Sequence, residues 1–199
     1  MPTQRVSRGK RKRRKGPPCL CVLDYDETLT ANRHCKTQTA LSQAGRDISK
    51  TQCGECELAI VSAGPPRNAR KVLSFPRKLS SIWWNVKASR KASVLPRILQ
   101  KLADKGIHIA KSDVHFFDDR DLSVNSWMEK EPTTNVHQVS CDSRRHDKGI
   151  CGSSIEEMNT SRGHFVCPDN RTGNQFIAKS FKNVGDSLSD IGGEGIGFL

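Results

Sequence analysis

Long apolar runs are missing from this 199-residue sequence. No stretch approaches the ~20 consecutive apolar residues that a membrane-spanning helix needs. A secretory signal is not evident either, because the basic N-terminus is followed by Gly16-Pro17-Pro18 and then by an apolar run that is too short. We therefore expect a soluble intracellular protein, cytoplasmic or nuclear, that is not secreted and has no membrane partner.

Aromatic residues are also scarce, at 6% of the chain. Stacking platforms for single-stranded nucleic acid are therefore not evident. Tyr25, Trp83 and Trp84 are the few candidates, and the two tryptophans are better interpreted as core residues. Apolar residues of all kinds make up only 35%, which indicates one compact domain with poorly ordered extensions.

Acidic residues are outnumbered, since 33 Lys and Arg face 21 Asp and Glu and leave a net charge of +12. This balance favours anionic partners. Residues 1–18 contain the dense basic cluster "RVSRGKRKRRKGPP". Two interpretations stay open: a nuclear address or nucleic-acid contact, and a solvated tail with no fixed partner.

Eight cysteines are present without a secretion signal, so we expect free thiols rather than a disulfide framework. Cys53 and Cys56 form a CxxC pair, with His34-Cys35 upstream. A zinc site that uses Cys35, Cys53, Cys56 and also His34 is a second interpretation, but the spacing is loose. Two free surface thiols are the favoured prediction for the CxxC pair.

Apolar runs alternate with helix-like stretches from Pro18 to Val139. Strands alternating with helices predict an α/β fold, a Rossmann-like parallel sheet with helices on both faces. Pro96 falls inside the last helical pattern, so that helix kinks or begins there, and Gly106 marks its end. The expected strands are residues 19–23, 57–63, 81–86 and 113–119, and the expected helices are residues 67–75 and 92–107.

The pattern fades after Cys141, where Gly, Ser, Asp and Arg dominate. Within this region, 164–167 and 174–181 are candidates for short strands. We predict three parts: a basic, disordered tail (1–18), a catalytic domain (19–140) and a polar C-terminal region (141–199) that is partly disordered or loosely packed.

Polar groups follow three of the expected strands, at the point where each strand ends. Asp24 and Asp26 follow the first, Ser62 the second, and the pair Asp118-Asp119 the last. Ligands bind at the carboxyl ends of parallel strands, so these groups should share one crevice. Crowded carboxylates raise each other's pKa, and Mg²⁺ relieves this because it prefers oxygen ligands. The sequence therefore predicts a Mg²⁺ site that receives a phosphoryl group, although single Asp residues at strand ends are also common in turns.

Three segments carry a family resemblance: "DYDET" (24–28), "IVSAG" (60–64) and "FFDDR" (116–120). In this order, each after an apolar run, they resemble motifs I, II and IV of the haloacid dehalogenase-like superfamily of phosphatases, DxDxT type. The resemblance covers roughly residues 19–139 and implies that superfamily's Rossmann-like fold.

The resemblance implies a role for each matching residue. Asp24 would be the nucleophile that forms an aspartyl-phosphate, and also a Mg²⁺ ligand. Asp26 would be the general acid and base, with its backbone carbonyl on Mg²⁺. Thr28 would hold the motif I loop, and Ser62 with the backbone N–H of Ala63 would bind phosphoryl oxygens.

The remaining implied roles belong to charged residues later in the chain. Asp118 would be a Mg²⁺ ligand, and Asp119 would be a second ligand or would support the first. The superfamily also needs a lysine that steadies the nucleophile, for which Lys91 fits best and Lys87 is the alternative. This chemistry requires no histidine, so we expect structural or exposed positions for His34, His108 and His115.

The substrate is suggested by the short spacing of the motifs. About 33 residues separate Thr28 from Ser62 and 28 separate Ser62 from Lys91, so neither interval holds a full cap domain. We expect an open site with little or no cap and a Mg²⁺-dependent phosphatase that acts on a macromolecule, either a phosphoprotein or a nucleic-acid end. The alternatives are a phosphatase of small metabolites or nucleotides, and a non-catalytic module that binds protein or nucleic acid on the same fold.

Overall fold

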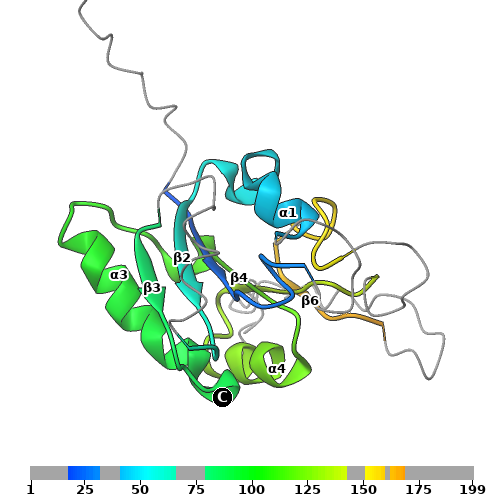
Figure 1. Cartoon of the computed structure of the whole chain (residues 1–199). Helices are drawn as coiled ribbons and strands as arrows, with labels where there is room; N and C mark the ends of the chain where they lie inside the picture. Colours follow the sequence, from blue (N-terminus) through cyan, green and yellow to red (C-terminus); the bar gives the residue numbers. More distant parts are fainter. Residues whose placement is uncertain (1–17, 32–40, 66–78, 143–150, 160–161, 169–199) are drawn as a thin grey trace, which may run out of the picture.

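Six parallel strands form one sheet at the centre of the protein (Figure 1). The computed structural model describes residues 18–31, 41–65, 79–142, 151–159 and 162–168. The strand order is β3-β2-β1-β4-β5-β6, which confirms the predicted Rossmann-like parallel sheet. The strands are β1 (Leu20–Leu23), β2 (Glu57–Val61), β3 (Ser81–Trp83), β4 (Val114–Asp118), β5 (Asn135–Gln138) and β6 (His164–Phe165).

The two central strands, β1 and β4, lie where the strand order reverses. All four residues of β1 are buried, because both faces of a parallel sheet are covered and its strands are continuous apolar runs. The register pairs Leu23 with Phe117, and the backbone N–H of Asp24 donates to the carbonyl of Phe117 at 2.8 Å. Asp24 and Asp118 are therefore neighbours at the carboxyl edge of the sheet.

Helices cover both faces of the sheet (Figure 1). One face packs against the 3₁₀ helix η4 (Ala88–Val94), α3 (Leu95–Ala103) and α4 (Asp121–Lys130). The other face packs against α1 (Gln43–Arg46) and the 3₁₀ helices η1 (Ile48–Lys50) and η2 (Gln52–Gly54). A further 3₁₀ helix, η5 (Lys111–Asp113), leads into β4.

Helix α3 follows the apolar pattern that predicts it. Leu95, Ile98 and Leu102 are buried on its inner face. Pro96 lies in its first turn, where the missing N–H has no helical partner to lose, so the helix begins there rather than kinks. Gly106 has a φ of 75° in the turn after the helix, a conformation that glycine adopts without strain.

The second half of the chain contains more regular structure than the sequence pattern predicts. Helix α4 and strand β5 were not predicted, whereas the short strand expected at 164–167 is present as β6. Beyond residue 140, Ser153 and Met158 are fully buried. The helix predicted at 67–75 and the strand predicted at 174–181 lie outside the described residues.

The expectation of free thiols is wrong. The strand register explains one of the bonds: Cys19 precedes β1 and Cys56 precedes β2, and their Cα atoms are 4.7 Å apart. Cys151 is also disulfide-bonded. No described cysteine is free, and the described pairs are Cys19–Cys56, Cys21–Cys53 and Cys141–Cys167.

The two predictions for the CxxC pair are wrong for the same reason. Cys53 and Cys56 are buried rather than at the surface. Each is bonded to a cysteine at the start of the first strand, so neither thiolate is available for the proposed zinc site. Disulfides are typical of oxidising compartments, so the cysteines no longer support the predicted intracellular location. Within the described ranges, no helix has the length and apolar character to cross a bilayer.

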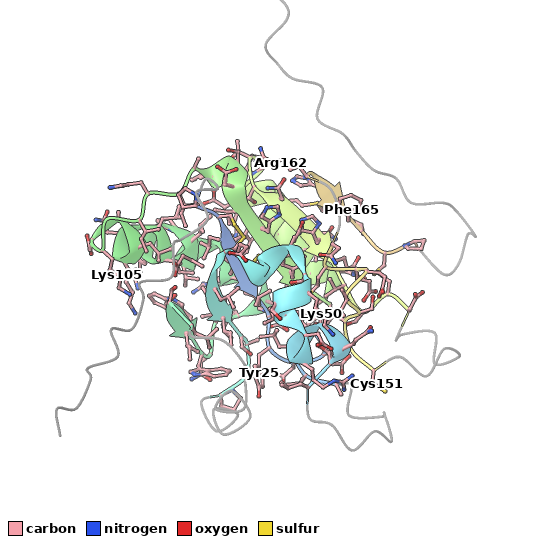
Figure 2. All side chains as sticks on the ribbon, turned by 90° about the horizontal axis from the view of Figure 1, so that it is seen from above. Tyr25, Lys50, Lys105, Cys151, Arg162 and Phe165 are labelled. Carbon is pink, nitrogen blue, oxygen red and sulfur yellow. A yellow bond between two sulfur atoms is a disulfide. The ribbon has the colours of Figure 1, made fainter. Side chains whose placement is uncertain are left out.

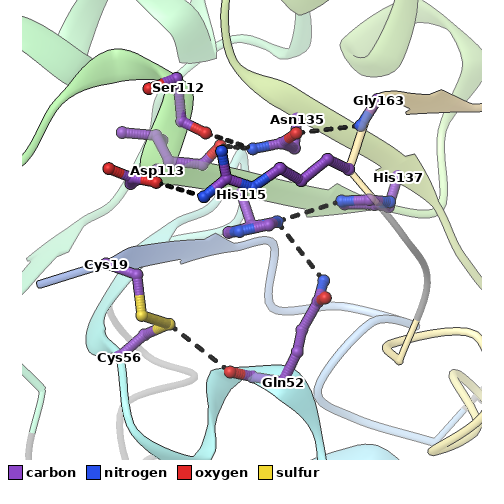
Figure 3. Close-up of polar contacts among 11 residues, drawn as sticks. Cys19, Gln52, Cys56, Ser112, Asp113, His115, Asn135, His137 and Gly163 are labelled. Carbon is purple, nitrogen blue, oxygen red and sulfur yellow. Dashed lines mark hydrogen bonds and ion pairs between the residues drawn. A yellow bond between two sulfur atoms is a disulfide. The ribbon is translucent and has the colours of Figure 1, made fainter. Parts of the chain in front are cut away.

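An aromatic ladder crosses one face of the sheet from β4 to β6. Phe117 stacks on His137 with ring centroids 4.7 Å apart, and His137 stacks on Phe165 at 5.4 Å. His115 lies beside them, between Gln52 and His137 (Figure 3). Its Nδ1 is 3.3 Å from Nε2 of His137 and 3.4 Å from Nε2 of Gln52.

Burial keeps both histidines of the ladder neutral. The pKa of His115 falls to about 4, chiefly because of burial and then because of the nearby Arg162, while Asp113 partly opposes the shift. Burial also lowers the pKa of His137 to about 3, helped by the neighbouring His115 and His164. The ordinary pKa of about 6.5 returns on unfolding. The fold is therefore stabilised above pH 6.5, and this stability is lost as the pH falls from there toward the folded values.

Replacing His137 by Phe should make the fold less sensitive to acid, because the ladder keeps an aromatic ring and loses a group that must be protonated. The free energy of unfolding, from urea titrations at pH 7 and pH 5, should fall less between the two values in His137→Phe than in the wild type. His108→Gln, at an exposed position, is the control and should behave as the wild type. An equal loss in His137→Phe and wild type would contradict the prediction.

Candidate active site

Three carboxylates meet at the carboxyl edge of the central strands. Asp24 follows β1, Asp118 ends β4, and Asp119 begins the next loop. All three are buried, and one oxygen of each lies within 4.8 Å of the others. The short apolar runs before them place their side chains here, as the sequence predicts.

Lys91 enters the same cluster from η4. Its Nζ is 2.5 Å from Oδ1 of Asp24 and 2.6 Å from Oδ2 of Asp118, and its side chain is only 1% exposed. Lys87, the alternative candidate, is exposed four residues earlier. Of the two lysines, Lys91 is the one that the structure brings to the carboxylates.

The buried carboxylates carry more negative charge than the single positive charge of Lys91 can balance. Burial, followed by the nearby Asp118, raises the pKa of Asp24 to about 8, and Lys91 only partly opposes this. The two carboxylates raise the pKa of Lys91 against the effect of its burial. Lys91 pairs with Asp24 and Asp118, and Asp119 adds a third carboxylate beside them. The cluster therefore keeps an excess of negative charge, which a divalent cation would neutralise.

The donor set fits Mg²⁺. This ion takes oxygen ligands at 2.0–2.1 Å in an octahedron, so opposite ligands lie about 4 Å apart. The carboxylate oxygens of Asp24, Asp118 and Asp119 are already within 4.8 Å of one another. Small side-chain shifts would therefore bring them to the required separation.

Asp118 is held by its backbone surroundings as well as by Lys91. Its Oδ1 accepts from the N–H of Arg120 at 2.9 Å, and its carbonyl accepts from the N–H of Val139 at 3.0 Å. Gln138 donates to the carbonyl of Asp119 at 3.2 Å. The β4 and β5 strand ends thus fix the loop that carries both carboxylates.

Asp26 and Thr28 lie in the turn that follows β1. Asp26 is half-buried and, together with burial, raises the pKa of Tyr25 to about 12. The N–H groups of Leu29 and Thr30 both donate to the carbonyl of Tyr25, which closes the turn. The hydroxyl of Thr28 is buried and has no hydrogen-bond partner among the residues that the structure describes.

Ser62 occupies the tip of the neighbouring strand. Its N–H donates to the carbonyl of Trp83 at 2.9 Å, and its carbonyl accepts from Val86 at 3.0 Å. Its Oγ accepts from the N–H of Gly64 at 3.0 Å, and the intervening Ala63 is exposed. The predicted phosphate-binding groups therefore follow β2, next to the strand that carries Asp24.

A segment that sequence reasoning missed supports the turn after β1. Ser42 and Ser153 both donate through their hydroxyls to the carbonyl of Thr28. Gly152 lies so close that a Cβ there would be 2.5 Å from the carbonyl oxygen of Thr30. Figure 2 shows Tyr25 and Cys151 at the same edge of the molecule. The only sequence signal was the small-residue run "CGSS" (151–154), which by itself indicates no contact.

The comparisons with known proteins give a limited likeness. No family model and no curated protein matches the chain. Among solved structures, the 3-deoxy-D-manno-octulosonate 8-phosphate phosphatase of Moraxella catarrhalis, in complex with magnesium ion, phosphate ion and KDO, is 18% identical with a TM-score of 0.39. That match covers 55% of this chain and 62% of the other, so the chain spans less than two thirds of that enzyme's length.

A cobalt-bound deoxy-D-mannose-octulosonate 8-phosphate phosphatase from Haemophilus influenzae is also similar. It is 12% identical with a TM-score of 0.42, and the match covers 72% of this chain and 85% of the other. These scores are low, and the chemistry of the site rests on its own geometry.

Lys91→Met should destabilise the fold strongly, because it leaves buried carboxylates without their ammonium partner. Breaking a buried ion pair from one side costs about 3–5 kcal/mol. Urea unfolding at neutral pH in the presence of chelator would measure this. Lys87→Met removes the same group at an exposed position and should change stability by about 0.5 kcal/mol or less. Similar losses in the two variants would show that Lys91 has no special structural role.

Proposed function

We propose that the protein is a Mg²⁺-dependent phosphatase that hydrolyses a phosphomonoester. The observation that carries the proposal is the buried Lys91 between Asp24 and Asp118 at the point where the strand order reverses. Ligands bind at this point in open α/β sheets. Lys91 and a divalent cation would both place positive charge beside Asp24. This charge would balance the negative charge of a bound phosphoryl group.

The proposed reaction has two steps. A carboxylate oxygen of Asp24 attacks phosphorus and the ester P–O bond breaks, while Asp26 gives a proton to the leaving oxygen. Asp26 then takes a proton from water, which attacks phosphorus, releases phosphate and restores Asp24. Lys91 orients Asp24 and balances negative charge on the phosphoryl group, and the groups at Ser62 and Ala63 bind phosphoryl oxygens.

Mg²⁺ would be held by the carboxylates of Asp24, Asp118 and Asp119 and by the backbone carbonyl of Asp26. When bound, it supplies positive charge to the phosphoryl oxygens. The acidic cluster supports this assignment, because its excess negative charge would otherwise oppose the approach of a phosphate.

The proposed substrate is a phosphate on a macromolecule. The segment between Thr28 and Ser62 supports an uncapped site, because its described residues 43–54 form short helices whose side chains Ala44, Ile48 and Cys53 are buried in the core. These residues belong to the domain itself. An uncapped site leaves room for a phosphate that is attached to a large molecule.

Asp24→Asn should abolish turnover and keep the fold, because an amide has nearly the same shape but is a poor nucleophile. Hydrolysis of para-nitrophenyl phosphate with Mg²⁺ should fall by roughly 10³-fold or more, as for the loss of other catalytic nucleophiles. The circular dichroism spectrum should not change. Substantial activity in the pure variant would remove Asp24 from the nucleophile role.

Chelation should remove the activity, and excess Mg²⁺ should restore it. Asp118→Ala should raise the Mg²⁺ concentration for half-maximal activity by about 10-fold or more, since it removes a charged ligand. Asp104→Ala, at an exposed position after α3, should leave the requirement unchanged. Full activity in chelator would contradict a metal-assisted reaction.

A further inference from the structure

Three cations lie on the outer face of helix α3 and in the turn that follows it. Arg97, Lys101 and Lys105 are exposed and are here called the cationic ridge. The opposite face of α3 is buried in the core through Leu95 and Ile98 among others. The ridge therefore faces solvent, and Figure 2 shows Lys105 at the outer end of this helix.

The ridge has a regular spacing. Arg97 and Lys101 are four residues apart in α3, so they stand one above the other on a single helical face, with Cβ atoms about 6 Å apart. Lys105 lies in the turn that directly follows the helix, and its N–H still donates to the carbonyl of Leu102 at 2.9 Å. A row of this kind matches a partner with repeated negative charges.

Within the part of the chain that the structure describes, no acidic residue forms an ion pair with the ridge. No ion pair among the described residues engages Arg97, Lys101 or Lys105, whereas three other surface cations are paired: Lys50, Lys111 and Arg162. The acidic residue within the ridge, Asp104, accepts a hydrogen bond from Gln100 instead. The ridge is thus a run of unpaired positive charge on an ordered helix.

The ridge starts close to the catalytic cluster in the chain. Helix η4 carries the buried Lys91 and continues directly into α3. Arg90, next to Lys91 in η4, is a further exposed cation in the same continuous segment. A long anion on the ridge could therefore reach the cluster with its end.

We propose that the cationic ridge binds the sugar–phosphate backbone of a nucleic-acid strand whose terminal phosphate is the substrate. This rests on the phosphatase function proposed above and narrows its substrate class. Phosphates repeat regularly along a nucleic-acid strand, as the cations do along the helix, whereas a phosphoprotein offers no fixed repeat. The scarcity of aromatic residues agrees with contacts to the backbone rather than to bases.

Binding can be tested separately from catalysis with the full-length Asp24→Asn protein. The probe is a fluorescent single-stranded oligonucleotide with a terminal phosphate, followed by anisotropy over a range of salt concentrations. The triple variant R97Q/K101Q/K105Q should bind about 10-fold or more weakly. Its slope of log affinity against log salt should be shallower by about 2, since each lost single-strand contact removes about 0.7.

The matched control is K50Q/K111Q/R162Q, which removes three exposed cations from other surfaces. It should bind within about twofold of the parent. Equal weakening in the two triple variants would indicate a general effect of net charge and would overturn the proposal. So would unchanged binding in the ridge variant.

Two further arms complete the test. The first arm measures a phosphopeptide of equal charge. If the ridge variant loses as much affinity for this peptide as for the oligonucleotide, the partner is an acidic polypeptide and the proposal is overturned. R97K/K101R/K105R keeps the charges and should bind as the parent does, which separates loss of charge from loss of fold.

With Asp24 intact, the ridge variants should hydrolyse para-nitrophenyl phosphate normally. If the wild type hydrolyses neither this ester nor the oligonucleotide, the phosphatase function fails while the binding result still stands.

Discussion

The ammonium group of Lys91 is the contact on which the central part of the structure depends. It joins the tips of β1 and β4, the two strands between which the order of the sheet reverses. Without it, buried carboxylates of adjacent strands would repel each other in surroundings that screen charge poorly. The same ammonium group holds the side chains of Asp24 and Asp118 close to each other. The interaction that allows the acidic cluster to be buried therefore also arranges it for chemistry.

The protein carries an excess of negative charge in its buried carboxylate cluster and positive charge on the exposed cationic ridge. The carboxylates of Asp24, Asp118 and Asp119 concentrate negative charge that Lys91 only partly balances. The exposed cations of the ridge have no ion-pair partner among the described residues. A long anion would be attracted to the ridge and repelled by the carboxylates until a cation neutralised them. Such an arrangement would make the order of binding, metal before substrate, a matter of electrostatics.

The sequence predicted the parts of the fold that depend on short-range patterns. Strands β1 and β4 are uninterrupted apolar runs that end in carboxylates, and Lys91 stands just before an amphipathic helix. Strand β5 was not predicted because three of its four residues, Asn135, His137 and Gln138, are polar, although all four are buried. Asn135 is buried there only because its amide donates to the carbonyls of Ser112 and Val114 and its oxygen accepts from Gly163. The supporting contact of Ser153 with Thr28 joins residues 125 positions apart, which no local pattern records.

The disulfides were missed for a related reason, since their partners face each other only once the strands are in register. They also give the chain a different connectivity from its linear order. Cys21 and Cys53 close a ring of covalent bonds that contains Asp24, and Cys19 and Cys56 close a second ring around it. A protease that cuts once between Cys21 and Cys53 would leave both fragments attached. The strand that leads to Asp24 and the next strand in the chain, β2, would therefore separate only after reduction.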